Sequence, residues 1–134
     1  PADVAVVVSG VNDVVGQVSP ARALAERERL ADWLLGAGLA RHVVFAALPP
    51  MGRFPLLPQP LARVLGADAA RHDAALARWA ATRSDVSRAE LVVDLDPQAM
   101  ASDGFHPGAA VYRRCGEALA AHIVSVLDTE ITHP

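Results

Sequence analysis

An uninterrupted apolar run near the start of the chain limits the folds that it can adopt. Residues 4–8 read Val-Ala-Val-Val-Val, with no polar residue in alternation, and Ser9 and Gly10 end the run. Such a run is typical of a strand buried on both faces of a parallel sheet, with helices covering both sides. We therefore expect an interior strand of an α/β protein here.

The alternation of strand and helix continues along the whole chain. Ser19 is a candidate helix cap and Pro20 a candidate first helical residue, ahead of leucines at helical spacing. Further strands are expected at residues 42–48 and 89–96, and helices at residues 20–35, 60–65, 68–82 and 107–127. Three strand–helix cycles predict a parallel sheet in a three-layer α/β/α fold, as one domain over residues 1–134.

Composition narrows the classes of function. With 134 residues, 52% hydrophobic and 20% charged, the chain is long enough for one globular domain and too short for two. A net charge of -3 gives no basic excess, which argues against a nucleic-acid partner. No apolar run approaches the length of a membrane span, so no integral membrane segment is expected. The single cysteine, Cys115, cannot form an internal disulfide.

Candidate functional residues and one proline-rich loop follow the ends of the expected strands. Asn12 follows the first strand, a proline-rich loop at residues 49–60 follows the second, and Asp103 and His106 follow the third. Because the carboxyl ends of parallel strands meet at one edge of a sheet, we expect these three loops to open on the same side.

These residue types suit acyl transfer. Asp103 precedes His106 by three residues in a Gly- and Pro-rich loop, so its carboxylate can accept from Nδ1–H and leave Nε2 to face a nucleophile. The amino end of the following helix disfavours the imidazolium and so favours a neutral base. Asn12 offers an N–H donor where an oxyanion could develop.

Two motifs resemble those of a known family. The segment GVND at residues 10–13 and the segment DGFHPG at residues 103–108 resemble the SGNH, or GDSL, hydrolases, which are serine esterases and lipases. The resemblance covers essentially the whole chain in order and spacing. It implies a flavodoxin-like fold, a small-molecule ester as substrate, no cofactor and an acyl-serine intermediate. It also implies that Asp103 and His106 are the triad acid and base, and that Asn12 is an oxyanion-hole donor.

The chain departs from that family at the nucleophile. The family carries its serine in a Gly-Asp-Ser block on the first strand and a further oxyanion glycine after the second, and this sequence has neither. The strand at residues 4–8 would then be the family's third. We therefore expect a domain incomplete at its N-terminus, an exposed apolar sheet edge, and either further N-terminal strands or a completing chain. Ser9 and Ser102 lie near the expected site, but strand-end and turn roles explain them better.

The loop at residues 49–60 contains five prolines and more apolar surface than a loop needs. Met51, Phe54 and Leu57 could form one wall of an acyl-binding groove, or they could be buried in the core.

Other interpretations of the site stay open. Asp103 could cap the final helix beside a surface His106, and Asn12 could simply tolerate a left-handed turn. A degenerate hydrolase fold could serve as a noncatalytic binding module, and a metal-assisted hydrolase could use the Asp and His as ligands. The remaining histidines lack metal-ligand spacing, so no metal site is expected. The arginines near the first long helix are spread among acids and are interpreted as a solvated face: Arg22, Arg27, Arg29 and Arg41.

Overall fold

Three parallel strands form the sheet in the computed structural model of the chain. The strands are β1 (Ala2–Val7), β2 (Ala40–Ala46) and β3 (Val86–Ala89), in the spatial order β1-β2-β3. The structure describes residues 1–91, 98–103 and 105–132.

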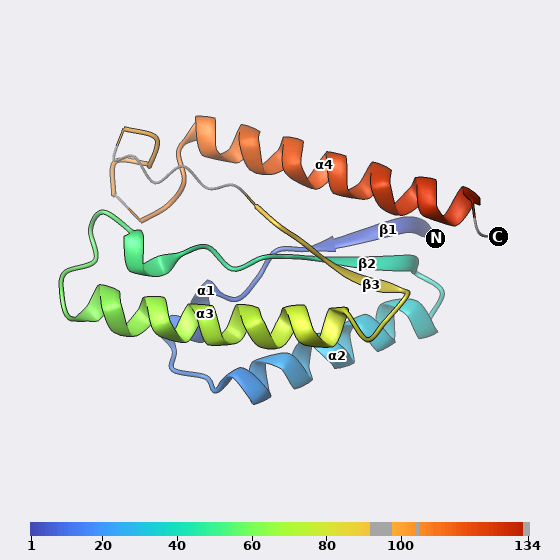
Figure 1. Cartoon of the computed structure of the whole chain (residues 1–134), viewed down its shortest axis with the longest axis horizontal. Helices are drawn as coiled ribbons and strands as arrows, with labels where there is room; N and C mark the ends of the chain where they lie inside the picture. The colour runs from blue at the N-terminus through green and yellow to red at the C-terminus, as the bar shows by residue number, and fades with distance from the viewer. Residues whose placement is uncertain (92–97, 104, 133–134) are drawn as a thin grey trace.

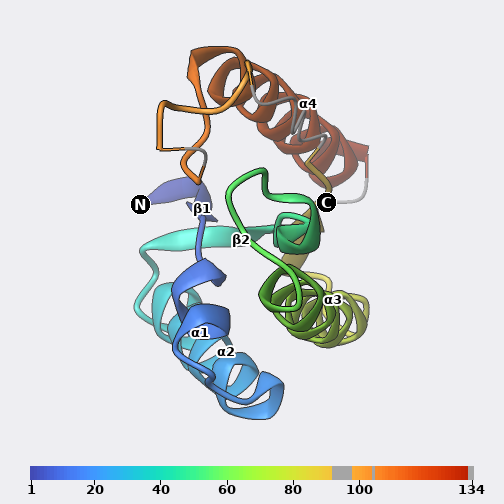
Figure 2. The same ribbon diagram turned by 90° about the vertical axis from the view of Figure 1, so that its left-hand side faces the viewer.

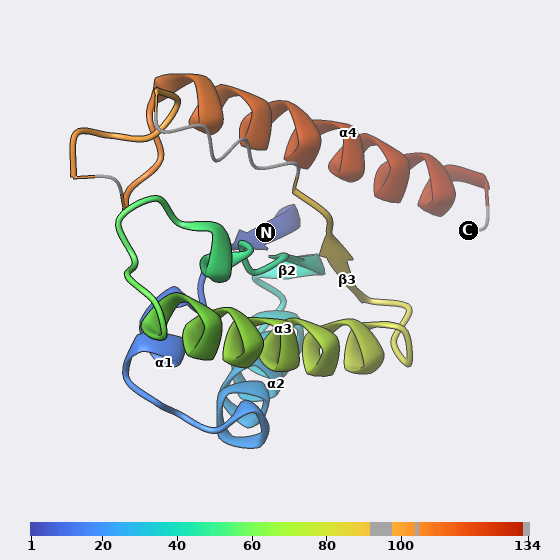
Figure 3. The same cartoon turned by 60° about the vertical axis from the view of Figure 1, so that its left-hand side comes forward.

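Helices lie on both faces of this sheet (Figures 1 and 2). Those on one face are α1 (Val11–Val15), α2 (Pro20–Gly36) and α3 (Leu61–Ala80), and α4 (Ala109–Thr132) runs along the other. A short 3-10 helix, η1 (Met51–Arg53), follows β2 and packs against α3 (Figure 3). The expected α/β architecture with a parallel sheet is confirmed, and α3 is one continuous helix where two segments were expected. No helix within the described residues has both the length and the apolarity needed to cross a membrane.

The core centres on β2. Val43, Val44 and Phe45 of this strand are fully buried, since β2 has a strand on each side and helices above and below. Trp79 of α3 packs edge-on against Phe45, with ring centroids 5.7 Å apart. Burial of each large apolar side chain contributes about 1.5–3 kcal/mol, so β2 is the rigid element from which the neighbouring loops extend.

The first strand is more exposed than the apolar run predicted. β1 lies at the edge of the sheet and pairs only with β2 among the described residues. Val6 is 39% exposed, and Val8, just after the strand, is 71% exposed. The expectation of burial on both faces is therefore wrong, because α4 packs against β3 on that face of the sheet and no described strand covers the outer side of β1. The expected exposed apolar edge is present.

The third strand begins earlier than expected. β3 occupies Val86–Ala89, whereas Glu90 and Leu91 lie outside it and residues 92–97 lie outside the described part of the chain. The apolar pattern alone did not predict the start of the strand, because Ser87 and Arg88 are polar.

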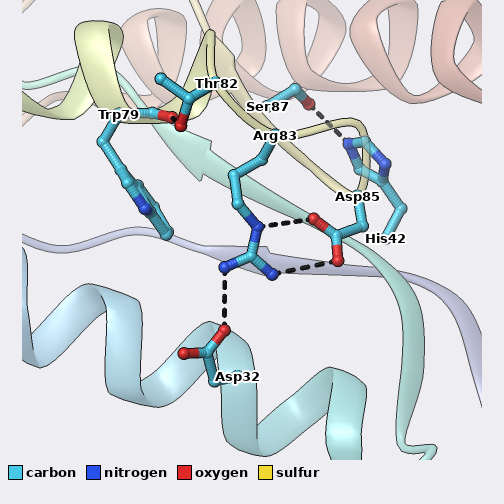
Figure 4. Close-up of polar contacts among 7 residues, drawn as sticks. All are labelled: Asp32, His42, Trp79, Thr82, Arg83, Asp85 and Ser87. Atoms are coloured by element: carbon cyan, nitrogen blue, oxygen red, sulfur yellow. Dashed lines mark hydrogen bonds and ion pairs between the residues drawn. The ribbon is translucent and has the colours of Figure 1, made fainter.

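Both polar side chains of β3 have partners that make the strand possible. Ser87 Oγ lies 2.8 Å from Nε2 of His42 and 2.8 Å from Nε2 of His122, so it joins β2 to α4 (the His42 contact is drawn in Figure 4). Arg88 donates two hydrogen bonds to the Asp73 carboxylate of α3, at 3.0 and 2.6 Å. A polar side chain is tolerated here because its hydrogen bonds are satisfied.

Arg83 holds the turn that leads into β3 (Figure 4). Its guanidinium donates two bonds to Asp85, at 2.8 and 3.0 Å, and one to Asp32 of α2 at 2.8 Å. The hydrogen bonds to Asp85 and then Asp32 raise the pKa of Arg83, and the bond to Arg83 lowers the pKa of Asp85. This network fixes the amino end of β3, leaving the carboxyl end of the sheet for the candidate site.

Candidate functional site

A closed loop between β3 and α4 presents Asp103 and His106. Met100 and Pro107 form an antiparallel bridge, and the Ala101 N–H donates to the His106 carbonyl at 2.8 Å. These contacts close the loop just before α4 begins, so the residues at its tip are held by backbone bonds on both sides.

Asp103 and His106 are brought into direct contact, as expected. Asp103 Oδ2 lies 2.5 Å from His106 Nδ1, and Asp103 Oδ1 accepts the backbone N–H of Phe105 at 3.0 Å and of His106 at 2.9 Å. One carboxylate therefore both caps the loop and orients the imidazole. No hydrogen bond reaches His106 Nε2 from any described residue, so this nitrogen is available to a proton donor.

These bonds determine the acidity of Asp103. The hydrogen bond to the His106 side chain, and then those to the two backbone amides, lower the pKa of Asp103 to about 2. The carboxylate thus stays charged over the whole range in which an imidazole titrates.

A pH titration tests this assignment. The folded-state pKa lies below the ordinary value, so the contribution of Asp103 to stability is complete above pH 4 and is lost as the pH falls towards 2. A carbon-13 NMR titration of the Asp103 carboxyl is expected to show a midpoint near 2. In His106→Ala the midpoint rises only partway to the ordinary value, because the two backbone bonds remain. An unchanged midpoint in that variant would contradict the assignment of the imidazole as the main cause.

A row of three rings connects this loop to the loop after β2. Phe105 packs edge-on against Phe54 at 5.3 Å and against His106 at 5.5 Å between ring centroids. Because Phe54 is buried, the loop after β2 supports the loop that carries the imidazole.

Asn12 shares a cavity with His106. The cavity has a volume of about 660 Å³ and is also lined by Ser9, Asp13, Tyr112 and Cys115. Asn12 lies in the first turn of α1 and not in an isolated turn, because Gly10 begins this short helix. Its side-chain amide makes no hydrogen bond to another described residue, so it can donate to an oxygen of a bound molecule.

The apolar residues of the loop at 49–60 divide between core and cavity. Met51 is fully buried in the core and does not line the cavity that holds Asn12 and His106, whereas Phe54 does. Leu57 lines a second, mainly aliphatic cavity of about 420 Å³, and Phe105 lines both. Both interpretations of the loop therefore apply, each to different residues.

Arg27 lies on the buried face of α2, and not on the solvated face that its charge predicted. It was expected on a solvated face, but its side chain is buried, and that expectation is wrong for this residue. Ala23 and Ala31, one helical turn away on either side, are buried too. The small residues at four-residue spacing were the signal that Arg27 lies on the inner face of α2.

The imidazole and its carboxylate are open to solvent. The His106 side chain is 67% exposed and that of Asp103 is 51% exposed. Within the described residues no serine hydroxyl is hydrogen-bonded to His106, although Ser9 lines the same cavity. No group of three or more His, Cys, Asp or Glu side chains in the described ranges is arranged to hold a metal ion.

Comparison with known proteins adds no relative. No protein-family model matches the chain, and no curated protein or solved structure is similar to it at a significant level. The resemblance to SGNH hydrolases therefore rests on the two sequence motifs alone.

Proposed function

We propose that this chain supplies the acid–base pair of an SGNH-type serine ester hydrolase. The observation that carries the proposal is the bond from His106 Nδ1 to Asp103 on the rim of the cavity that Asn12 also lines. The base His106, with Asp103 orienting it, and the oxyanion donor Asn12 therefore lie at the same cavity. Acyl transfer requires this arrangement.

Each side chain has a defined role in the reaction. His106 Nε2 takes the proton from a serine hydroxyl as the serine oxygen bonds to the ester carbonyl carbon, and Asp103 stabilises the imidazolium that forms. The Asn12 amide donates to the carbonyl oxygen as it gains negative charge. The bond to the alcohol then breaks as His106 returns the proton, and a water molecule repeats the two steps to release the acid and restore the serine.

The nucleophilic serine is proposed to lie outside this sequence, on further strands of the same polypeptide or on a completing chain. Three observations support this: the solvent exposure of His106, the lack of a bonded serine in the described residues, and the unpaired outer edge of β1. A strand that pairs with β1 would cover Val6 and stand beside the cavity. The resulting domain would be a flavodoxin-like SGNH domain.

The cavities favour an uncharged, apolar ester. No arginine lines either cavity within the described residues, and the sequence contains no lysine, so neither cavity offers a cationic side chain to a carboxylate or phosphate group. The second cavity is lined mainly by aliphatic side chains: Val15, Leu57, Leu61, Val64 and Leu65. We assign it to the acyl chain of the substrate.

Chain-length preference tests the assignment of the walls. In the natural protein, Leu57→Ala is expected to lower kcat/KM for p-nitrophenyl octanoate more than for p-nitrophenyl acetate, because Leu57 lines only the second cavity, which only the longer chain reaches. Phe54→Ala is expected to lower kcat/KM for both esters, because Phe54 supports Phe105 beside the imidazole, but with the larger loss for the octanoate. Losing the contacts of one or two methylene groups of the substrate lowers kcat/KM by about 10-fold or more. Leu56→Ala is the matched control, since Leu56 is exposed and lines neither cavity. Equal losses on both esters would count against the wall assignment.

A noncatalytic binding module is the second candidate. The observation that favours it is the lack of a serine hydrogen-bonded to His106 in the described part of the chain. Such a module would bind an ester without cleaving it, so turnover of p-nitrophenyl acetate by the natural protein separates the two functions.

A further inference from the structure

Arg27 of α2 places a buried positive charge beneath the segment that carries Asn12. The residue is 5% exposed. A Cβ added at Gly10 would lie 2.7 Å from Arg27 Nη2, so the guanidinium lies against the backbone of this glycine. Gly10 also has a φ of 126°, which non-glycine residues rarely adopt. A side chain at position 10 would therefore clash with Arg27 and strain the backbone, so the buried position of Arg27 requires glycine there.

The charge of Arg27 is incompletely paired. Nη2 is buried and has no hydrogen-bond partner among the described residues, and its ion-pair contact to Asp13 Oδ2 is 3.8 Å long. The charge of Asp73 also acts on this guanidinium, but the Asp73 carboxylate is hydrogen-bonded to Arg88 and to the Leu48 N–H. Burial lowers the pKa of Arg27, and the two carboxylates oppose that shift. Burying a guanidinium with incomplete pairing lowers the stability of the folded protein. Helix packing alone therefore does not explain why an arginine occupies this position.

We propose that Arg27 is a positioning residue for the oxyanion site at Asn12, an inference that rests on the proposed ester hydrolysis. Asp13 follows Asn12 and lines the same cavity, where its carboxylate would repel the negative charge that develops on the ester oxygen. The positive charge of the Arg27 guanidinium offsets that carboxylate, and the guanidinium packs against Gly10, just before α1 begins. The site therefore accepts an oxyanion although a carboxylate lies on its wall.

Charge-removing variants of the natural protein test this inference. Arg27→Met should lower kcat for p-nitrophenyl acetate by about 10- to 100-fold with little change in KM, because the charge acts on the transition state. Arg27→Lys should retain most of kcat. Asp13→Asn should leave kcat near its native value or raise it, because it removes the repelling carboxylate, and the double variant Asp13→Asn/Arg27→Met should recover at least about fivefold over Arg27→Met alone.

The double variant separates charge from packing. A double variant as slow as Arg27→Met, at equal Tm, would overturn the proposal, since removing the carboxylate would then relieve nothing. If Arg27→Met does not fold, the amide proton and nitrogen NMR shifts of Arg27→Gln decide, because Gln also removes the charge: changes at residues 10–13 support the positioning role, and their absence contradicts it. A natural protein that cleaves no ester contradicts the proposed function instead, and the same NMR comparison still tests whether Arg27 positions the segment.

Discussion

Replacing His106 with Asn is expected to lower kcat for p-nitrophenyl acetate by about 10⁴-fold or more in the natural protein, with KM nearly unchanged. Asn cannot take a proton from the nucleophile, although it can fill much of the same space. The imidazole acts in the transition state, so the loss falls on kcat and not on binding. Steady-state kinetics on this ester, with Tm measured in parallel, checks the expectation.

Two further variants sharpen that test. Asp103→Asn should cost about 10³- to 10⁴-fold, because an amide N–H facing Nδ1 forces the ring into the tautomer with its proton on Nε2. His122→Asn is the matched control, since His122 lies in α4 and contacts Ser87 of β3, away from the cavity. It should keep most of its activity. A His106→Asn protein with nearly native kcat would contradict the role of this imidazole as the base.

The second large effect is expected at Gly108. A Cβ at this position would lie 2.3 Å from the Ala99 carbonyl oxygen, which accepts the Gly108 N–H at 2.8 Å. Gly108→Ala must therefore open the loop that carries Asp103 and His106. A displacement of about 1 Å can cost 10²-fold in rate, so kcat should fall by about 10- to 100-fold.

A glycine in open surroundings provides the control for this variant. An added Cβ at Gly36, the last residue of α2, would meet no atom of the described residues within 4 Å outside its own helix turn, so Gly36→Ala should leave kcat unchanged. Kinetics of both variants, with Tm measured for each, separates loop geometry from overall stability. Equal activity in the two variants would show that the close approach at Gly108 does not set the position of the imidazole.

The sequence was informative wherever local rules decide structure. The first long helix begins as predicted, because the Ser19 hydroxyl accepts the Arg22 N–H and Pro20 occupies the first helical position. The contact between Asp103 and His106 was predicted as well, since a separation of three residues in a tight loop allows the carboxylate to reach Nδ1, although a capping role for Asp103 stayed open until the structure showed the contact.

Features that depend on packing between distant segments were not predictable. An apolar run shows that a strand prefers burial but not which elements cover it, and so burial of β1 on both faces was wrongly expected, although the exposed edge was anticipated from the departure from the SGNH pattern. The start of β3 was concealed because Ser87 and Arg88 become tolerable only through partners on other elements. Arg27 was assigned to the solvent-exposed face of α2 because arginine is usually exposed. The alanines four residues before and after it, which are buried in the structure, were given too little weight.

The central claim is that the Asp103–His106 pair activates a serine for attack on an ester. Labelling the natural protein with a fluorophosphonate probe, followed by peptide mapping, tests this most directly. We expect one labelled serine, located outside this sequence, and loss of the label in His106→Asn. A natural protein that takes up no label, or one that is labelled equally well without the imidazole, would contradict it.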